Sequence, residues 1–254
     1  RITVHRRAEV VATDGFMGQF RSVIRRGKGS VADEVEVRHG ATVIATGARA
    51  TVPTEHGYGA DPRVITQSEL EQTLADRPEA LSDVRDLVMI QCVGSRNAER
   101  PYCSRVCCSQ AVKNALQVKS QHPGANVFVL YRDLRTYGLK ERYYRRARQA
   151  GVTFLRYDEA RPPQVRPGGG RLEVKVFAQE LGREVLLGAD RVVLSVGLEP
   201  AEQSRLVEAF KLPTSADGFF AEAHMKLRPV DFASEGLFLC GTAHAPKFLS
   251  EAIS

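Results

Sequence analysis

Four cysteines lie close together in the chain, and their thiols are the side chains with the most distinctive chemistry. The stretch CVGSRNAERPYCSRVCC, residues 92–108, holds four of the five cysteines among 254 residues. Cys92 ends an apolar run, whereas Cys107 and Cys108 are adjacent and open a segment with the apolar stripe of a helix. In a reducing compartment, clustered cysteines indicate metal or redox chemistry more than structural disulfides.

The spacing C-x10-C-x3-C-C suits a [4Fe–4S] cluster, which takes one thiolate for each of its irons. Cys103 and Cys107 are four residues apart and would share one helical face, with Cys108 beside them at the start of the helix. The positive end of that helix would favour an anionic cluster. Three nearby arginines could add positive charge: Arg96, Arg100 and Arg105.

Other chemistries for the same cysteines stay open. Tetrahedral zinc commonly uses C-x2-C pairs and seldom adjacent ligands. A redox-active disulfide could join Cys92 and Cys103 across the loop, or join the adjacent pair under strain. The thiols could also be inert buried side chains. We favour the cluster on spacing, with Cys92, Cys103, Cys107 and Cys108 as metal ligands.

The segments around the cysteines predict a Rossmann-like, NAD(P)-type module over residues 84–200. The run DLVMIQCV, residues 86–93, is a continuous apolar strand of the kind buried in a parallel sheet. After the cysteines come a helix, a strand, a helix and a strand, which make half of a Rossmann fold. An ordinary first strand runs into G-x-G-x-x-G, whereas here only Gly94 of those glycines remains. We therefore expect the cysteines to replace the dinucleotide cradle, and NAD(P)H not to bind there.

The rest of the chain predicts a second module, a partial FAD-binding domain built from residues 1–75 and 212–254. Its early strands alternate apolar and polar residues, as in a hairpin. Two buried strands end in VIATGA and VLSVGLEP, at the points where the chain would cross between modules. The N-terminal G-x-G-x-x-G unit of such a domain is missing, so the sequence looks like a fragment.

Composition and charge exclude several classes of protein. A hydrophobic fraction of 43% and a charged fraction of 26% are ordinary for a soluble globular protein. No apolar run approaches the roughly 20 residues of a membrane span. Residues 1–20 lack a signal-peptide pattern, so we expect a cytoplasmic protein. The net charge of +6 has one local cluster, KERYYRRARQ at residues 140–149, which favours a solvated face or an acidic protein partner over nucleic acid.

Several stretches resemble the A subunit of heterodisulfide reductase, and together they cover nearly the whole chain. They are QCVGSRNAERPYCSRVCCSQAVKNAL, VLYRDLRTYG, YYRRARQAGV, HGYGADPRVITQSELE and KLRPVDFASEGLFLCGTAHAPK. The resemblance implies an α/β, thioredoxin-reductase-like two-module flavoprotein core, with FAD and a [4Fe–4S] cluster as cofactors. It also implies an oxidoreductase that passes electrons among flavin, clusters and partner subunits, with flavin-based bifurcation in some members. The expected partners are other heterodisulfide reductase-like subunits and ferredoxin or hydrogenase-type donors, with a homodimer as one assembly.

The same resemblance assigns roles to individual residues. Cys92, Cys103, Cys107 and Cys108 match its cluster motif. The flavin-binding positions are Thr46, Gly47, Gly241, Thr242, His244, Ala245 and Lys247. As catalytic residues, Lys113 matches a lysine near the reactive edge of the flavin, where a cation would stabilise an anionic reduced flavin, and Glu69 is a carboxylate facing it.

Two departures and two alternative functions follow from the same residues. Without the pyrophosphate-binding unit, we expect the isolated chain to hold FAD weakly and to be inactive. The C-x2-C-x2-C motifs of ferredoxin-type clusters are also missing.

The first alternative is a pyridine-nucleotide-disulfide oxidoreductase whose cysteines cycle between dithiol and disulfide. The second is a zinc-binding scaffold that docks partners through its arginine-rich helix. The fifth cysteine, Cys240, follows an apolar strand and is predicted to be a small core residue.

Overall fold

The chain divides into two compact units, which a computed structural model describes over residues 1–27 and 33–253. Unit 1 comprises Arg1–Arg49 and Glu199–Ser254, and unit 2 comprises Ala50–Leu198. Residues 50–75 therefore lie in unit 2, although the sequence pattern predicted a module of residues 1–75. The reason is strand pairing, because β6 (Val64–Thr66) runs parallel to β13 (Arg191–Val196) in the central sheet of unit 2.

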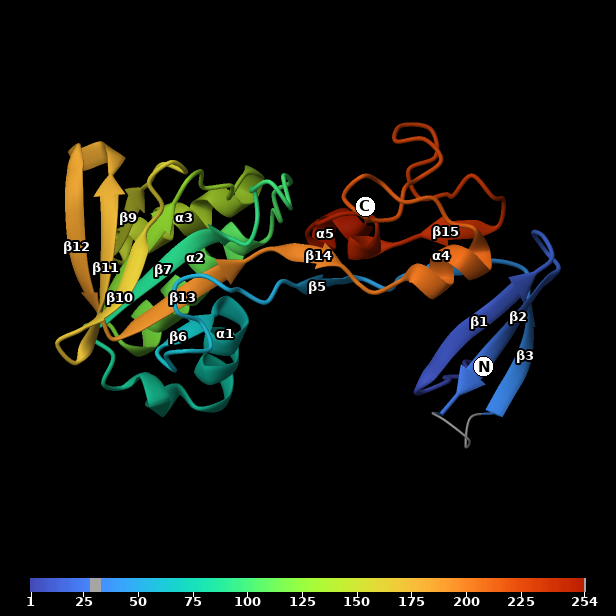
Figure 1. Ribbon diagram of the computed structural model, residues 1–254, viewed down its shortest axis with the longest axis horizontal. Coiled ribbons are helices and arrows are strands. Elements are labelled where there is room, and N and C mark those ends of the chain that lie inside the picture. The colour runs from blue at the N-terminus through green and yellow to red at the C-terminus, as the bar shows by residue number, and fades with distance from the viewer. Residues whose placement is uncertain (28–32, 254) are drawn as a thin grey trace. The chain divides into compact units, whose positions relative to one another are not determined.

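Unit 2 is built on a five-stranded parallel sheet of order β6-β13-β7-β8-β9 (Figure 1). Its other strands and its helices have the following bounds: β7 (Asp86–Val93), β8 (Asn126–Tyr131), β9 (Val152–Arg156), α1 (Gln67–Asp76), α2 (Cys107–Gln121) and α3 (Glu141–Gln149). β7 coincides with the predicted apolar strand. The alternation of β7, α2, β8, α3 and β9 is the predicted half of a Rossmann fold.

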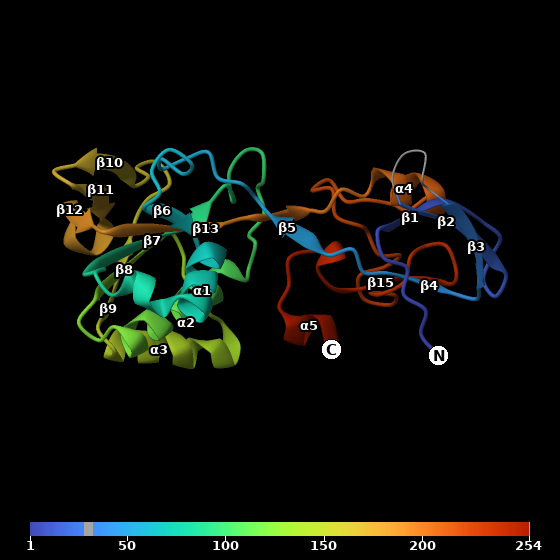
Figure 2. The ribbon, with the colours of Figure 1, turned by 90° about the horizontal axis from the view of Figure 1, so that it is seen from below.

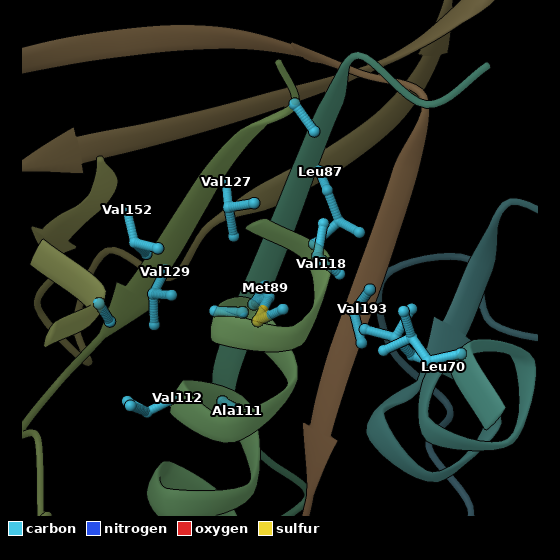
Figure 3. Packing of buried hydrophobic residues seen from close by; sticks show 14 of the residues in the cluster. Leu70, Leu87, Met89, Ala111, Val112, Val118, Val127, Val129, Val152 and Val193 are labelled. Carbon is cyan, nitrogen blue, oxygen red and sulfur yellow. The ribbon is translucent and has the colours of Figure 1, made fainter. Parts of the chain in front are cut away.

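The parallel sheet lies between two layers, helices on one face and an antiparallel sheet on the other (Figure 2). The antiparallel sheet consists of β10 (Gln164–Gly168), β11 (Arg171–Ala178) and β12 (Arg183–Ala189). Along β7, Leu87 and Met89 pack with the helices (Figure 3), whereas Val88 and Ile90 pack toward the antiparallel sheet. Burial on both faces explains why this strand is a continuous apolar run rather than an alternating one.

Unit 1 contains a three-stranded antiparallel sheet and a short parallel pair. The antiparallel strands are β1 (Ala8–Asp14), β2 (Phe20–Arg26) and β3 (Asp33–His39). The parallel pair is β4 (Thr42–Ile44) with β15 (Leu237–Leu239). A core of Phe20, Phe210, Phe220 and Phe232 joins these strands to α4 (Ser204–Phe210).

The remaining elements are short. They are β5 (Ala48–Ala50), β14 (Leu198–Pro200), α5 (Leu249–Ile253) and the 3-10 turns η2 (Pro78–Leu81), η3 (Gly138–Lys140), η4 (Gln179–Leu181) and η5 (Gly241–Ala243). Within residues 1–27 and 33–253, no helix combines the length and apolar character needed to cross a membrane.

Candidate functional site

The cysteine stretch begins where β7 leaves the sheet through unusual backbone conformations. Cys92, Gly94 and Arg96 have φ angles of 64°, 63° and 58°, in the left-handed region that favours glycine. A non-glycine residue costs about 1–2 kcal/mol there, so two such residues within five positions store strain. Strain of this kind concentrates at functional sites, where the surrounding structure holds it in place.

The order of the strands puts this stretch at the switch point of the sheet. β8 and β9 lie on one side of β7, and β13 and β6 lie on the other. In open α/β sheets, ligands bind outside the carboxyl ends of the strands at the point where the order reverses. The cysteine stretch follows β7 directly and therefore lies at that point.

At this switch point the chain closes on itself. The Gly197 amide donates to the Val93 carbonyl (3.0 Å), and the Tyr102 hydroxyl donates to the Leu198 carbonyl (2.9 Å). The Leu198 amide donates to Ser104 Oγ (2.7 Å). A Cβ on Gly197 would stand only 2.9 Å from the carbonyl oxygen of Gly94. The loop and the strand end are thus packed closely against each other.

A buried polar network supports the strand end from below, and sequence patterns did not predict it. Ser195 Oγ accepts from Gln67 Nε2 (3.1 Å) and from Gln91 Nε2 (2.7 Å). Asn114 Nδ2 donates to Gln67 Oε1 (2.8 Å). All four side chains are at most 1% exposed. Their signal in the sequence is a polar residue inside an otherwise apolar run, as in DLVMIQCV and RVVLSVG.

Of the four predicted ligands, Cys107 and Cys108 open α2, and Cys92 lies near the end of β7. Cys103 precedes the helix, so the prediction that it shares a helical face with Cys107 is wrong. Cys107 and Cys108 are buried, and Cys92 and Cys103 are half-buried. The Arg105 amide donates to Cys103 Sγ (3.3 Å), and Arg96 Nη1 lies 3.9 Å from Cys92 Sγ. The N-cap residue Val106 makes no side-chain hydrogen bond to the helix, so the thiols lie at an uncapped positive helix end.

The adjacent thiols differ in acidity. A hydrogen bond to Cys108, together with burial and the neighbouring thiol charges, raises the pKa of Cys107. The same hydrogen bond lowers the pKa of Cys108 to about 7, against the opposing effect of burial. Burial raises the pKa of Cys92, with Arg96 opposing the rise. The hydrogen bond between the adjacent thiols thus favours the thiolate, the form that ligates metals, at Cys108 over Cys107.

The donor set fits an iron–sulfur cluster in kind, because all four donors are free thiols. The thiol charges of Cys92, Cys103 and Cys108 each contribute to the raised pKa of Cys107. Over the residues that the structure describes, however, no three His, Cys, Asp or Glu side chains converge closely enough to hold a metal ion. The assignment of the four cysteines as ligands therefore stays a prediction.

The two predicted catalytic residues have other contacts in unit 2. Lys113 Nζ lies 2.5 Å from Glu71 Oε1, and its side chain is 48% exposed. Glu69 accepts from the Thr66 amide (2.6 Å) and receives a 3.2 Å hydrogen bond from Tyr58, which makes it the capping-box residue of α1. Their roles at a flavin stay predictions.

In unit 1 the two predicted flavin turns lie side by side. β4 and β15 are paired in parallel, and the Cys240 amide donates to the Ile44 carbonyl (2.9 Å). The chain then turns at Gly47 (φ 74°) and Gly241 (φ 66°). A Cβ on Gly47 would stand 3.6 Å from Thr242 Oγ1, and a Cβ on Gly241 would meet nothing within 4 Å. Thr46 precedes Gly47 in the first turn, and Thr242 follows Gly241 in the second. The two predicted pairs of flavin-binding residues therefore lie in neighbouring turns.

A polar triad follows the second turn. His244 Nε2 lies 2.7 Å from Glu222 Oε2, and Lys247 Nζ lies 2.8 Å from His244 Nδ1. Because an ammonium group only donates, Nδ1 accepts and Nε2 carries the proton toward Glu222. Ala245 lies half-buried in the same turn. Glu222 was not predicted, since nothing in its sequence neighbourhood distinguishes it.

The prediction that Cys240 is a core residue is wrong, because its side chain is exposed. β15 ends at Leu239, and Cys240 is the residue that precedes the turn η5. It therefore lies past the buried part of the strand. The phenylalanine core of unit 1 takes Leu237 and Leu239 from this strand instead.

Comparison with solved structures defines the class of fold. Thioredoxin reductase of T. acidophilum matches 95% of this chain and 67% of its own, with 14% identity and a TM-score of 0.55. A Kutzneria ornithine N-hydroxylase matches 97% and 68%, with 14% identity and a TM-score of 0.56. The chain thus has the predicted α/β fold, which is that of thioredoxin-reductase-like flavoproteins.

Comparison with curated sequences goes further. The A subunit of the H(2):CoB-CoM heterodisulfide,ferredoxin reductase of Methanothermobacter thermautotrophicus is 37% identical over 240 residues, which are 87% of this chain and 36% of that protein. The iron-sulfur A subunit of the CoB--CoM heterodisulfide reductase of Methanocaldococcus jannaschii is 38% identical over 241 residues, with the same coverage. No protein-family model matches the sequence. The predicted resemblance is confirmed: this chain is a homologue of heterodisulfide reductase A subunits and spans about a third of their length.

Proposed function

We propose that the chain is the redox core of an FAD- and iron–sulfur-dependent oxidoreductase of the heterodisulfide reductase A type. Its role is to pass electrons between flavin, clusters and partner subunits. One observation carries the proposal: a four-cysteine stretch lies at the switch point of a Rossmann-like sheet, where the chain itself fills the place of a phosphate cradle. The name of one homologue, which calls it iron-sulfur, supports it.

In this proposal Cys92, Cys103, Cys107 and Cys108 hold a [4Fe–4S] cluster. When bound, the cluster supplies one-electron transfer. The chain contributes the positive end of α2, the Arg105 amide beside Cys103 and the guanidinium of Arg96 beside Cys92. Asp133 fixes that guanidinium through a 2.7 Å contact. Each of the three contributed groups stabilises negative charge on sulfur.

Unit 1 would hold FAD at the paired turns. The residues in contact would be Thr46, Gly47, Gly241, Thr242, His244, Ala245 and Lys247. When bound, the flavin supplies two-electron and one-electron chemistry. The open backbone at Gly241 would permit close approach of the cofactor, beside the hydrogen-bonded side chains of Lys247, His244 and Glu222. Lys113 and Glu69 belong to unit 2, so their roles at the reactive edge of the flavin rest on the resemblance alone.

The wider setting forms part of the same proposal. The complete protein would be cytoplasmic and would work with other heterodisulfide reductase-like subunits and with ferredoxin or hydrogenase-type electron donors. The proposal extends to flavin-based bifurcation and to a homodimeric assembly of the complete protein. NAD(P)H would not bind in unit 2.

Iron analysis after anaerobic reconstitution tests the cysteine assignment. The wild type should take up about four irons and four sulfides per chain and show broad visible absorption. Cys107→Ser should lose the absorption, because serine is a poor ligand for iron–sulfur clusters. Cys240→Ser is the matched control, since Cys240 is exposed and lies in unit 1.

Three outcomes would contradict the assignment. Full cluster content in Cys107→Ser would exclude this residue as a ligand. Stoichiometric zinc that resists replacement by iron would favour the scaffold alternative. A reversible disulfide between Cys92 and Cys103, with no iron uptake, would favour a pyridine-nucleotide-disulfide oxidoreductase.

A further inference from the structure

The positive charge of the chain is concentrated in one segment of unit 2, residues 135–149, which we name the basic segment. It contains six basic side chains and one acidic side chain, whereas the net charge of the whole chain is +6. The six are Arg135, Lys140, Arg142, Arg145, Arg146 and Arg148. The other 239 residues are therefore close to neutral in sum. A field this localised attracts negatively charged partners to one place.

The arginines of α3 face solvent. Ala147 is the one fully buried residue of the helix, and it packs in the helix-side core. Arg142, Arg146 and Arg148 are exposed. The helix therefore has a narrow buried edge and a broad cationic face.

Three of the four arginines on α3 have aromatic rather than acidic neighbours. The fourth, Arg145, pairs with Glu141 at 2.9 Å. Within the described part of the chain, Arg142, Arg146 and Arg148 have no carboxylate partner; they lie over the rings of Tyr143 or Tyr144. Stacking on tyrosine leaves the guanidinium charge uncompensated and holds it in position.

The arginines of β2 in unit 1 are arranged differently. Arg21, Arg25 and Arg26 each contact an acidic residue of β3: Glu36, Glu34 and Asp33 respectively. Cross-strand pairing neutralises that surface locally. The uncompensated charge of the basic segment is thus not a general property of arginines in this chain.

The basic segment is attached to the cysteine site. Tyr137 Oη accepts from Arg105 Nη2 at 2.6 Å, and Arg105 lies within the cysteine stretch. Just before the segment, the carbonyl of Asp133 lies 3.7 Å from Cys108 Sγ. A partner bound to the basic segment would therefore lie beside the cysteines.

We propose that the basic segment is the docking surface for an acidic protein that exchanges electrons with the cysteine site. The electron-exchange part of this inference rests on the proposed function. The chemistry favours a protein because the basic segment includes exposed apolar and aromatic side chains: Leu139 is 82% exposed, Tyr137 45% and Tyr143 39%. Tyrosine and arginine dominate the energetics of protein interfaces.

Equilibrium binding of an acidic ferredoxin to the full-length protein tests the proposal. The variant is Arg142→Glu with Arg146→Glu, which reverses two charges on α3. The matched control is Arg166→Glu with Arg183→Glu, an equal change of net charge at exposed positions of β10 and β12. We expect about a tenfold weaker Kd in the α3 variant and less than about twofold in the control, with a shallower salt dependence in the α3 variant. The milder Arg142→Gln with Arg146→Gln should give an intermediate Kd, and unchanged melting temperatures would show that all variants fold.

Competing results would overturn the proposal. Equally weak ferredoxin binding in both double variants would show that only net charge matters. Absence of ferredoxin binding in the wild type would refute the docking surface. Tighter binding of single-stranded DNA or of anionic phospholipid vesicles, with the same dependence on Arg142 and Arg146, would assign the surface to another class of partner. Iron content measured on the same samples separates the two proposals. Specific binding by protein that takes up no iron would support the docking surface and contradict the cluster.

Discussion

Two turns, one in each unit, follow the carboxyl end of a buried parallel strand and differ in what fills the space beyond it. After β7 in unit 2, the chain folds back and bonds to the end of β13 through Val93, Ser104 and Leu198. After β15 in unit 1, the backbone at Gly241 is left open, with nothing within 4 Å of a built Cβ. The first turn is closed by its own chain, and the second is accessible.

In the proposed function, one topological position serves two kinds of cofactor. A closed turn that places thiols after the strand suits an inorganic cluster better than a dinucleotide. An open turn of glycine backbone admits the surface of an organic cofactor. Variants that open the first turn or obstruct the second test this contrast.

The largest effect is expected where the closed turn depends on the buried network. Ser195→Ala would leave the amide N–H groups of Gln67 and Gln91 without their acceptor, which should reduce the free energy of unfolding by about 2–4 kcal/mol. Chemical denaturation measures the change. Ser109→Ala is the matched control, because Ser109 Oγ has no hydrogen-bond partner among the described residues; it should change stability by less than about 0.5 kcal/mol. Equal losses in both variants would contradict a supporting role for the network.

A smaller effect should follow from steric obstruction of the same turn. In Gly197→Ala, the new Cβ would meet the Gly94 carbonyl at 2.9 Å and Ser95 Cβ at 3.0 Å, so the backbone must shift. Overpacking of this kind costs about 1–3 kcal/mol. Gly124→Ala, where a Cβ meets nothing within 4 Å, is the control. Thermal unfolding that fails to separate the two variants would mean that the turn is less closed than its hydrogen bonds indicate.

On the open turn, obstruction should act through the backbone alone. Gly241→Ala introduces no clash, but it forces alanine to a φ of 66°, at about 1–2 kcal/mol. If the turn contacts FAD, the variant should also retain less FAD in the full-length protein, as measured by flavin absorption after gel filtration. Wild-type retention together with the stability loss would show that Gly241 serves the fold only.

The sequence predicted the strand and helix around the closed turn better than the buried network that supports it. β7 and the helix after it were readable, because strands buried on both faces are continuous apolar runs and helices carry a stripe. The pattern placed Cys107 and Cys108 at the start of α2, whereas Cys103, predicted on the same helical face, lies before the helix. The network of Gln67, Gln91 and Ser195 could not be predicted, since its members lie far apart in the chain and meet only when the sheet forms.

The errors have physical reasons of the same kind. Cys240 comes directly after Leu239, the buried last residue of β15. Because successive side chains point to opposite sides, the next side chain points away from the core. The grouping of residues 50–75 with the first module overlooked the parallel pairing of β6 with β13, a contact between segments more than 100 residues apart. Glu69 forms the capping box of α1 with Thr66, which the T-x-x-E pattern indicates, and its role at a flavin stays a prediction.

The smallest expected effect concerns the contact between Glu222 and His244, beside the open turn. Hydrogen bonding to its own backbone amide and to His244 lowers the pKa of Glu222 from its usual 4.5. A carboxyl whose pKa is lower in the folded state stabilises the fold above the unfolded pKa, and the stabilisation is lost as the pH falls through the folded pKa. Between about pH 5 and pH 3, the wild type should therefore lose more stability than Glu222→Gln. The side chain is 19% exposed, and solvent screening keeps the difference below about 1 kcal/mol. Denaturation at a series of pH values measures it, with the exposed Glu208→Gln as control; parallel pH profiles for wild type and Glu222→Gln would show that the His244 contact does not persist in solution.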